Sequence, residues 1–270
     1  MSVSFNFLEN KAAFIRKETL LLHALAPETR IASSLSCVEI LVALYYGNIV
    51  KIHPKHLLAE DRDRIIISKG HGSISLYPIL ADLGYFNKSE LKKICKPGSF
   101  LGGIPDCIIP GYETTNGSLG HGPGVACGIA LALKNKKNDA HIFVILGDGE
   151  MQEGSVWEAI IFAGHHKLNN LIFIIDNNKV GMLDFTKNIL DMEPLTEKFS
   201  VFGWDVCETD GHSIPSMLSA LKRSKSKSIK KPKVIVANTI KGKGVPRLEK
   251  DGLSHTRTLS KDEIENLINS

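Results

Sequence analysis

Short unbroken runs of apolar residues along the chain alternate with longer segments in which apolar positions follow helical spacing. Residues 142–146 and 171–175 form two such runs, rich in β-branched side chains, as is typical of strands buried on both faces of a sheet. Residues 156–166, which lie between them, have helical spacing. The three segments predict a strand–helix–strand unit, in which both strands end at the same edge of a parallel sheet.

The remainder of the pattern extends this unit in both directions. Residues 28–36 and the Gly- and Pro-rich residues 97–123 lack periodicity and are expected to form loops. We expect one α/β domain over residues 1–270, with three α/β/α layers and a mostly parallel sheet. The pattern predicts further strands at 65–67, within 202–212 and at 233–239, and helices at 7–25, 37–46, 74–83, 125–133, 195–202 and 260–268.

Composition places the chain among ordinary globular proteins. It has 270 residues, of which 43% are hydrophobic and 23% charged, enough for one large domain with a substantial core. The net charge of +4 is concentrated in residues 222–233, which read KRSKSKSIKKPK. No aromatic residue is interleaved with these lysines, so a solvated helix end and loop is favoured over a nucleic-acid-binding surface.

Cysteines and segment lengths bear on the cellular compartment. The five cysteines, an odd number with no CxxC pair, do not indicate a zinc site and suit a reducing cytoplasm. The N-terminal residues lack the basic segment and apolar core of a secretory signal. No apolar run approaches about 20 residues, so no membrane-spanning helix is expected. We therefore expect a cytoplasmic protein.

Polar side chains follow both strands of the central unit. Gly147-Asp148-Gly149-Glu150 comes directly after the first strand, and Asn178 comes just after the second, thirty residues beyond Asp148. Because ligands bind at the carboxyl ends of parallel strands, these two side chains are expected to meet there. Their hard oxygens suit Mg²⁺, which completes its octahedron with phosphates and water. A Gly-Asp-Gly turn alone is common, whereas its combination with the later Asn is far more specific.

Two Gly-rich segments stand before expected helices. In the first, Ser-Lys-Gly-His-Gly-Ser at 68–73, His71 could donate to a phosphate at a helix N-terminus, or be a satisfied loop residue. In the second, Asn-Gly-Ser-Leu-Gly-His-Gly-Pro-Gly at 116–124, glycines would let the backbone approach a flat ring. Simple helix capping is the alternative reading of the second segment.

Taken together, these segments resemble those of transketolases and related thiamine diphosphate enzymes. The resemblance runs from about residue 15 to residue 270 and is strongest at 70–73, 117–122, 147–154 and 176–178. It implies the thiamine diphosphate-binding fold, with Gly147, Gly149 and Glu150 in the cofactor motif. It also implies that Mg²⁺ grips the cofactor's diphosphate and is held by three residues: the side chains of Asp148 and Asn178 and the carbonyl of Val180.

The same resemblance assigns roles to the Gly-rich segments. It implies that His71 contacts cofactor and substrate, and that Gly117, Ser118 and Leu119 line the thiazolium and aminopyrimidine rings. His255 matches by position a histidine that contacts the diphosphate and substrate, although its flanking residues, Ser-His-Thr-Arg, differ from the usual Trp-His-Gly. His71 and His255 are thus the expected catalytic residues.

Length separates this chain from a complete transketolase, which is more than twice as long. Complete enzymes carry a pyrimidine-binding domain, whose glutamate helps to generate the reactive ylid of the cofactor. The chain therefore resembles the N-terminal subunit of a split enzyme, and is expected to need a separate C-terminal subunit, in an α₂β₂ assembly. Glu153 matches a glutamate between two active sites in relatives, and an exposed helix-start glutamate is the alternative.

Two departures from the family pattern concern the substrate. Arg30 and Ile104 stand where transketolases carry two histidines that contact sugar hydroxyls. Arginine cannot act as a base but can pair with a carboxylate or phosphate, and isoleucine removes hydrogen bonding. We expect a substrate other than an ordinary pentose phosphate, with a modified sugar or a 2-oxo acid as candidates.

The expected activity is transfer of a two-carbon ketol unit between carbonyl, sugar-derived compounds, with thiamine diphosphate and Mg²⁺ as cofactors. One alternative is a subunit of a 2-oxo acid decarboxylase or dehydrogenase. The segments 117–122 and Lys-Gly-Lys-Gly at 241–244, the second expected to be a mobile loop, favour the transketolase reading. A non-catalytic derivative of the fold is the other alternative, and intact Asp148 and Asn178 speak against it.

Overall fold

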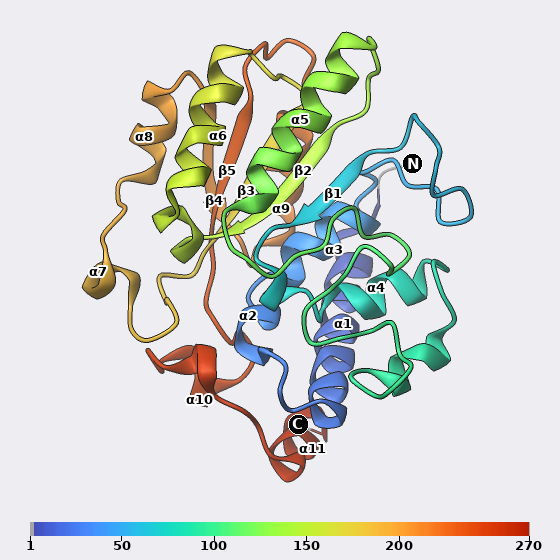
Figure 1. The fold of residues 1–270 in the computed structure, drawn as a ribbon. Coiled ribbons are helices and arrows are strands. Elements are labelled where there is room, and N and C mark those ends of the chain that lie inside the picture. The colour runs from blue at the N-terminus through green and yellow to red at the C-terminus, as the bar shows by residue number, and fades with distance from the viewer. Residues whose placement is uncertain (1–2, 270) are drawn as a thin grey trace.

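A parallel sheet of five strands forms the centre of the computed structural model, which describes residues 3–269 (Figure 1). The strand order is β1-β2-β3-β5-β4, and every neighbouring pair is parallel. All carboxyl ends therefore lie at one edge of the sheet. The strands are β1 (Arg64–Ile67), β2 (Ile142–Gly147), β3 (Leu171–Asn177), β4 (Asp205–Asp210) and β5 (Lys233–Asn238).

Alternate residues of β1, β2, β3 and β5 enter different cores, which is why these strands are largely apolar, whereas the edge strand β4 is mostly polar. On β2, for example, Phe143 and Ile145 pack into one cluster, and Val144 and Leu146 into the other. The first cluster is covered by α1 (Phe5–Leu25), α3 (Val38–Tyr46), α4 (Leu76–Asp82) and α9 (Ile214–Ser224), and the second by α5 (His121–Asn135), α6 (Gly154–His165) and α8 (Leu195–Val201). The expected three-layer α/β fold is confirmed.

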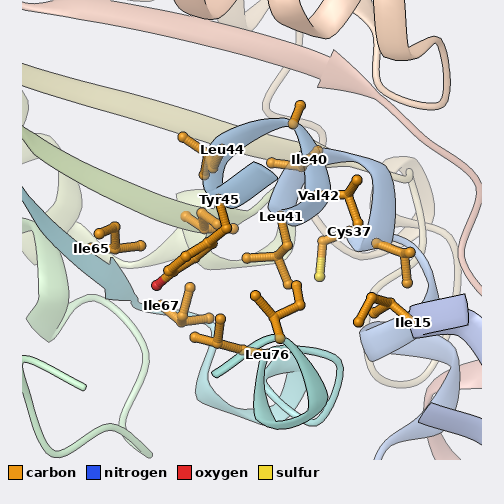
Figure 2. Close-up of a cluster of buried hydrophobic side chains, with 14 of the residues drawn as sticks. Ile15, Cys37, Ile40, Leu41, Val42, Leu44, Tyr45, Ile65, Ile67 and Leu76 are labelled. Atoms are coloured by element: carbon orange, nitrogen blue, oxygen red, sulfur yellow. The ribbon is translucent and has the colours of Figure 1, made fainter. Parts of the chain in front are cut away.

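Helix α3 is buried on all sides and lies between β1 and the helices of its layer. Every residue of the helix is buried, as its nearly uninterrupted apolar sequence requires. Figure 2 shows Leu41 and Tyr45 of α3 directed toward Ile67 of β1 and Leu76 of α4. This packing anchors the segment that enters α3 and the loop that leaves β1, both of which lie at the carboxyl edge.

Smaller elements surround that edge and were only partly predicted. The expected loop at 28–36 contains a short helix, α2 (Ile31–Leu35), whose five residues are all buried. It packs with residues of α10 (Pro246–Glu249) and α11 (Lys261–Asn269) in a third apolar cluster. A further short helix, α7 (Thr186–Ile189), follows β3.

The expected start of α5 at residue 125 was wrong, because the helix begins at His121. Gly120 precedes it with a left-handed φ of 81°, and Pro123 lies in the first turn, where its missing N–H costs no hydrogen bond. The other predicted helices and strands differ from the observed ones by one or two residues at most ends. No helix within residues 3–269 is both long and apolar enough to cross a bilayer.

Candidate functional site

A cavity of about 410 Å³ opens at the carboxyl edge of the sheet. The ends of β2 and β3 form its floor, and the loops after β1, β3 and β5 form its walls. Charged and polar side chains from distant parts of the sequence converge on it, among them Ser33, Lys69, His71, Asp148, Glu150, Asn178, Lys241 and His255.

The two side chains expected to bind metal lie together in this cavity. Gly147 pairs in register with Asp176, so the residues after β2 and β3 emerge side by side. The Asp148 carboxylate accepts hydrogen bonds from the amides of Gly149, at 2.8 Å, and Lys179. The Asn178 Oδ1 atom accepts from the Val180 amide at 3.2 Å. These bonds fix Asp148 against the turn that carries Asn178 and Val180.

The oxygen atoms of this group fit a hard cation. Burial, and to a lesser degree Asp176, raise the pKa of Asp148 to about 6, a penalty that a bound cation would relieve. A carboxylate offers about four acceptor positions and an amide oxygen two, so Asp148 and Asn178 each retain capacity for a ligand. No cluster of three or more His, Cys, Asp or Glu suited to a metal occurs within residues 3–269. A site here would instead use one carboxylate, one amide and one carbonyl, as Mg²⁺ bound to phosphates does.

Lys241 brings a buried positive charge into the cavity, and sequence reasoning did not select it. Its Nζ donates to the carbonyl oxygen of Val180 at 2.7 Å and to Nδ1 of His255 at 3.1 Å. Burial first, and then repulsion from Lys69, lower its pKa to about 8. The available signal was the position of 241–244 after a strand at the carboxyl edge.

A buried ion pair beneath the cavity was also missed. The ammonium group of Lys69 pairs with Asp176, which also accepts hydrogen bonds from the hydroxyls of Ser36 and Thr239. Burial alone would raise the pKa of Asp176, but Lys69 and these hydrogen bonds hold it below its ordinary value. The pair joins the ends of β1, β3 and β5 to the segment after α2, and so fixes the cavity floor.

The two expected catalytic histidines face each other, with ring centroids of His71 and His255 4.8 Å apart. Burial, followed by Lys241, lowers the pKa of His255 to about 3, and burial followed by Lys69 lowers that of His71 well below its ordinary value. Both rings are therefore neutral. Because a lysine ammonium only donates, Nδ1 of His255 accepts and its Nε2 carries the proton.

Glu150 lines the cavity, but its oxygens are occupied by protein donors. They accept from the amides of Gly120 at 2.9 Å and Gly147 at 3.3 Å, and from the hydroxyl of Ser68. Burial raises the pKa of Glu150, and these bonds partly offset that effect. Its carboxylate therefore joins the loop before α5 to the ends of β1 and β2.

The Gly-rich loop before α5 contributes only in part to the cavity wall. Gly117 and Leu119 line the cavity, whereas Ser118 is exposed and is not among the lining residues. Ile104 is about half exposed, and its Cγ2 lies 3.9 Å from the position of a Cβ on Gly117.

Arg30 lies outside the cavity lining, as Ile104 does. It directly precedes α2 and is near enough for its charge to contribute to the lowered pKa of His255. The two residues expected to concern substrate thus lie beside cavity residues without forming the cavity wall.

A model of the family described as "Transketolase, thiamine diphosphate binding domain" matches residues 30–270. The chain belongs to this family. Two curated relatives match this chain over nearly their whole length. One of them, from Actinobacillus succinogenes, is named as a subunit of apulose-4-phosphate transketolase and is 40% identical over 266 residues, covering 98% of this chain and 95% of the relative. The 6-deoxy-6-sulfo-D-fructose transketolase subunit SqwG of Clostridium sp. strain MSTE9 is 39% identical, covering 94% of this chain and 92% of the relative.

Solved structures show the same fold in longer chains. The transketolase of Campylobacter jejuni superposes with a TM-score of 0.93 at 30% identity, covering 99% of this chain but only 43% of that enzyme. The expected enzyme class, a transketolase-type transferase dependent on thiamine diphosphate, is confirmed, as is the resemblance to an N-terminal transketolase subunit.

Proposed function

We propose that this chain is the diphosphate-binding subunit of a two-chain transketolase that moves a two-carbon ketol unit between sugar-derived carbonyl compounds. One observation carries the proposal: Asp148, Asn178, Lys241 and two neutral histidines converge on a single cavity at the carboxyl edge of the sheet. Oxygen ligands for a divalent cation lie there beside buried ammonium groups, which is the pairing that a metal-bound diphosphate needs.

Within this cavity the described residues have separable tasks. Asp148, Asn178 and the carbonyl of Val180 would hold Mg²⁺, and Lys241 would neutralise phosphate oxygens. Gly117 and Leu119 would approach the cofactor rings. Thiamine diphosphate held here would supply a nucleophilic carbon for carbonyl compounds, and the residues of this chain would supply orientation and electrostatics.

Neutral His71 and His255 are suited to orient substrate oxygens and to exchange a proton with them. Each neutral imidazole offers one donor and one acceptor nitrogen. Since Nδ1 of His255 accepts from Lys241, its Nε2–H is the group available to a substrate oxygen. A charged imidazole could only donate, so the low pKa of His71 preserves both functions of its ring, whereas His255 offers a substrate oxygen only its Nε2–H.

The second half of the active site would come from a separate subunit that carries a pyrimidine-binding domain, in an α₂β₂ assembly. Two observations support this: the match to nearly all of two relatives named as subunits, and to only 43% of the Campylobacter jejuni enzyme. The chain, one domain over residues 1–270, would then bind one side of the cofactor and catalyse nothing alone.

For the substrate we favour a modified sugar over an ordinary pentose phosphate. Arg30 and Ile104, beside the cavity, replace two sugar-contacting histidines of the resembling family. The names of two relatives refer to apulose 4-phosphate and to 6-deoxy-6-sulfo-D-fructose, which are such sugars. A 2-oxo acid substrate is the alternative that Arg30 would also accommodate.

The test is calorimetric titration of the chain with thiamine diphosphate, in the presence of the C-terminal subunit, with and without Mg²⁺. We expect Mg²⁺-dependent binding that Asp148→Ala abolishes and that Asp262→Ala, an exposed control in α11, leaves unchanged. Absence of Mg²⁺-dependent binding in the complete complex would overturn the proposal in favour of a non-catalytic protein.

Turnover assays of the same complex then address the reaction. Ketol transfer from a modified sugar is expected to exceed transfer from xylulose 5-phosphate to ribose 5-phosphate, and efficient use of the ordinary pair would contradict the substrate assignment. Release of carbon dioxide from pyruvate would instead indicate a 2-oxo acid decarboxylase.

A further inference from the structure

Outside the cavity, three side chains from α1, α3 and the segment after β4 converge on the loop that carries Lys241. We infer that His212, fixed by Glu39, is a positioning residue for Lys241, an inference that rests on the proposed function for the value of that lysine. Within residues 3–269, the hydrogen bonds of His212 go to Asp210, Glu39 and Ile240, none of which lines the cavity. His212 acts on the backbone immediately before Lys241.

The hydrogen bonds of His212 show which of its ring nitrogens is the donor and which is the acceptor. The amide of Ile240 donates to its Nε2 at 2.8 Å, so this nitrogen must be the acceptor. The Nδ1 atom lies 2.8 Å from Oε2 of Glu39 and therefore carries the proton that it donates to that carboxylate. Ile240 is the residue directly before Lys241. The carboxylate thus fixes the ring, and the ring fixes the peptide that leads into Lys241.

Arg16 of α1 holds both the carboxylate and the other side of the loop. Its guanidinium pairs with Glu39, and its Nη1 donates to the carbonyl of Lys243 at 2.6 Å. Although burial raises the pKa of Glu39, His212 and Arg16 together hold it below its ordinary value, so the carboxylate is ionised. The backbone is therefore held two residues after Lys241 as well as one residue before it.

The glycines of this region are explained by the same arrangement. Gly242 and Gly244 have φ angles of 77° and 89°, which favour glycine. A Cβ at Gly244 would lie 2.8 Å from Cδ of Arg16, and one at Gly211 would lie 2.4 Å from the methyl carbon of Thr239. Any larger residue would push the loop off Arg16, or push His212 away from β5. The Lys-Gly-Lys-Gly segment, expected to be a mobile loop, makes these contacts in the structure.

Fixing the backbone on both sides matters because the lysine side chain is long and flexible. A lysine side chain loses rotamer freedom when it is ordered, and a displaced Cα would change which acceptors its ammonium reaches. In the structure that ammonium is buried and lies on Val180 and His255. Arg16, Glu39 and His212 form a hydrogen-bonded chain, called the relay below, that holds the backbone on both sides of Lys241. The relay thus sets the position of the ammonium group that is proposed to bind the diphosphate.

A double-mutant cycle on the complex with the C-terminal subunit tests the inference, with thiamine diphosphate affinity as the readout. We expect His212→Ala to weaken affinity about 10-fold, the lower end seen for residues that orient a binding group. We expect His212→Gln, whose amide can accept from Ile240 and donate to Glu39, to recover most of it. His56→Ala, an exposed histidine away from the cavity, is the matched control and is expected to change nothing.

The decisive comparison uses Lys241→Met as the background. If His212 acts through Lys241, adding His212→Ala to Lys241→Met causes no further loss of affinity. A further loss of about 10-fold in that background would overturn the inference, since the effect would then bypass the lysine.

A second measurement separates this inference from the proposed function. Amide hydrogen exchange of the isolated chain is expected to show faster exchange at Ile240 in His212→Ala than in the wild type or His212→Gln. Faster exchange without any cofactor binding by the wild-type complex would mean that the relay exists and the proposed function is wrong. Unchanged exchange at Ile240 would refute the relay itself, whatever the cofactor affinity.

Discussion

Burial keeps His23, a histidine remote from the cavity, neutral, and its hydrogen-bond partners determine which ring nitrogen carries the proton. Its Nδ1 lies 2.8 Å from the hydroxyl of Thr29, which itself donates to the carbonyl of Ala26. The amide of Leu259 donates to its Nε2 at 3.2 Å. His23 thus joins the C-terminal end of α1 to the segment before α11, and a proton on Nε2 would remove the acceptor that makes this link.

This arrangement predicts a specific loss of stability in acid. Burial lowers the pKa of His23 from 6.5 to about 4 in the folded chain, so the unfolded chain binds the proton more readily. The contribution of neutral His23 to the free energy of unfolding is fully present above pH 6.5. It is lost as the pH falls toward 4, which lowers the free energy of unfolding by up to about 3 kcal/mol. We expect the free energy of unfolding, measured in urea at several pH values, to fall less steeply with decreasing pH in His23→Gln than in the wild type. In the exposed control His56→Gln, the free energy of unfolding should depend on pH as it does in the wild type. The same pH dependence in His23→Gln as in the wild type would contradict the prediction.

Some residues of the cavity can be predicted from the sequence, and others cannot. Asp148 and Asn178 follow apolar strand runs directly, so the topology of a strand–helix–strand unit places them together. Lys69, Asp176 and Lys241 are brought together by the order of β1, β2, β3 and β5 in the sheet, which no local pattern contains. The sequence therefore predicts the oxygen ligands but not the buried cations that balance them.

Elements meet closely at a few glycines, and Gly164 in the last turn of α6 is one of them. A Cβ there would lie 2.0 Å from the carbonyl oxygen of Phe202, so α6 approaches the corner between α8 and β4 only without a side chain. Gly128 in the middle of α5 has no atom within 4 Å of such a Cβ. The packing therefore excludes a side chain at Gly164 but leaves room for one at Gly128.

Replacing each glycine by alanine is expected to change stability in opposite directions. Gly164→Ala should destabilise the chain by about 1–3 kcal/mol, because the helix must move from backbone that cannot yield. Gly128→Ala should be stabilising by about 0.5–1 kcal/mol, since alanine has the higher helix propensity and meets no obstacle. Free energies of unfolding in urea would measure both. Equal effects of the two substitutions would show that the contact with Phe202 does not limit the packing of α6.

Helix boundaries illustrate why element prediction was incomplete. The apolar run at 125–133 was recognised, but α5 starts earlier because Gly120 adopts a left-handed conformation that propensity does not reveal. Helix α2 was missed because five residues carry no helical periodicity, and its apolar residues are buried partly against α10 and α11, which lie more than 200 residues away in the sequence. Long strand runs were predicted well because burial on both faces leaves a signal in the sequence itself.

At the scale of the whole molecule, the lysine-rich segment 222–233 makes hydrogen bonds and ion pairs with distant parts of the fold, which its composition does not indicate. Lys225 donates to the carbonyl of Ile49 at 2.7 Å and to Asp63 at 3.0 Å, and Lys227 pairs with Asp139. These contacts tie the end of α9 to segments before β1 and β2. Lys225 and Lys227 therefore have partners within the fold.

An exposed apolar rim beside a polar cavity is the feature of the whole molecule that bears on assembly. Met182, Leu183 and Ile189 line the cavity and yet are 56%, 69% and 47% exposed. Contiguous apolar groups of this kind, next to a binding site, mark surfaces that another chain covers. We expect the C-terminal subunit to cover this rim and so to close the cavity over the cofactor.

Charged substitutions on the rim should therefore weaken assembly without unfolding the chain. Leu183→Asp is expected to weaken binding of the C-terminal subunit by about 10-fold or more, because a buried carboxylate without a partner is costly in an interface. Leu58→Asp is the matched control, since Leu58 is 94% exposed and is not part of the cavity. Sedimentation equilibrium of mixed subunits measures the affinity, and circular dichroism of the isolated variants establishes that both remain folded. Undiminished association of Leu183→Asp would place the partner elsewhere, because a subunit that shares this cavity cannot avoid a side chain at its mouth.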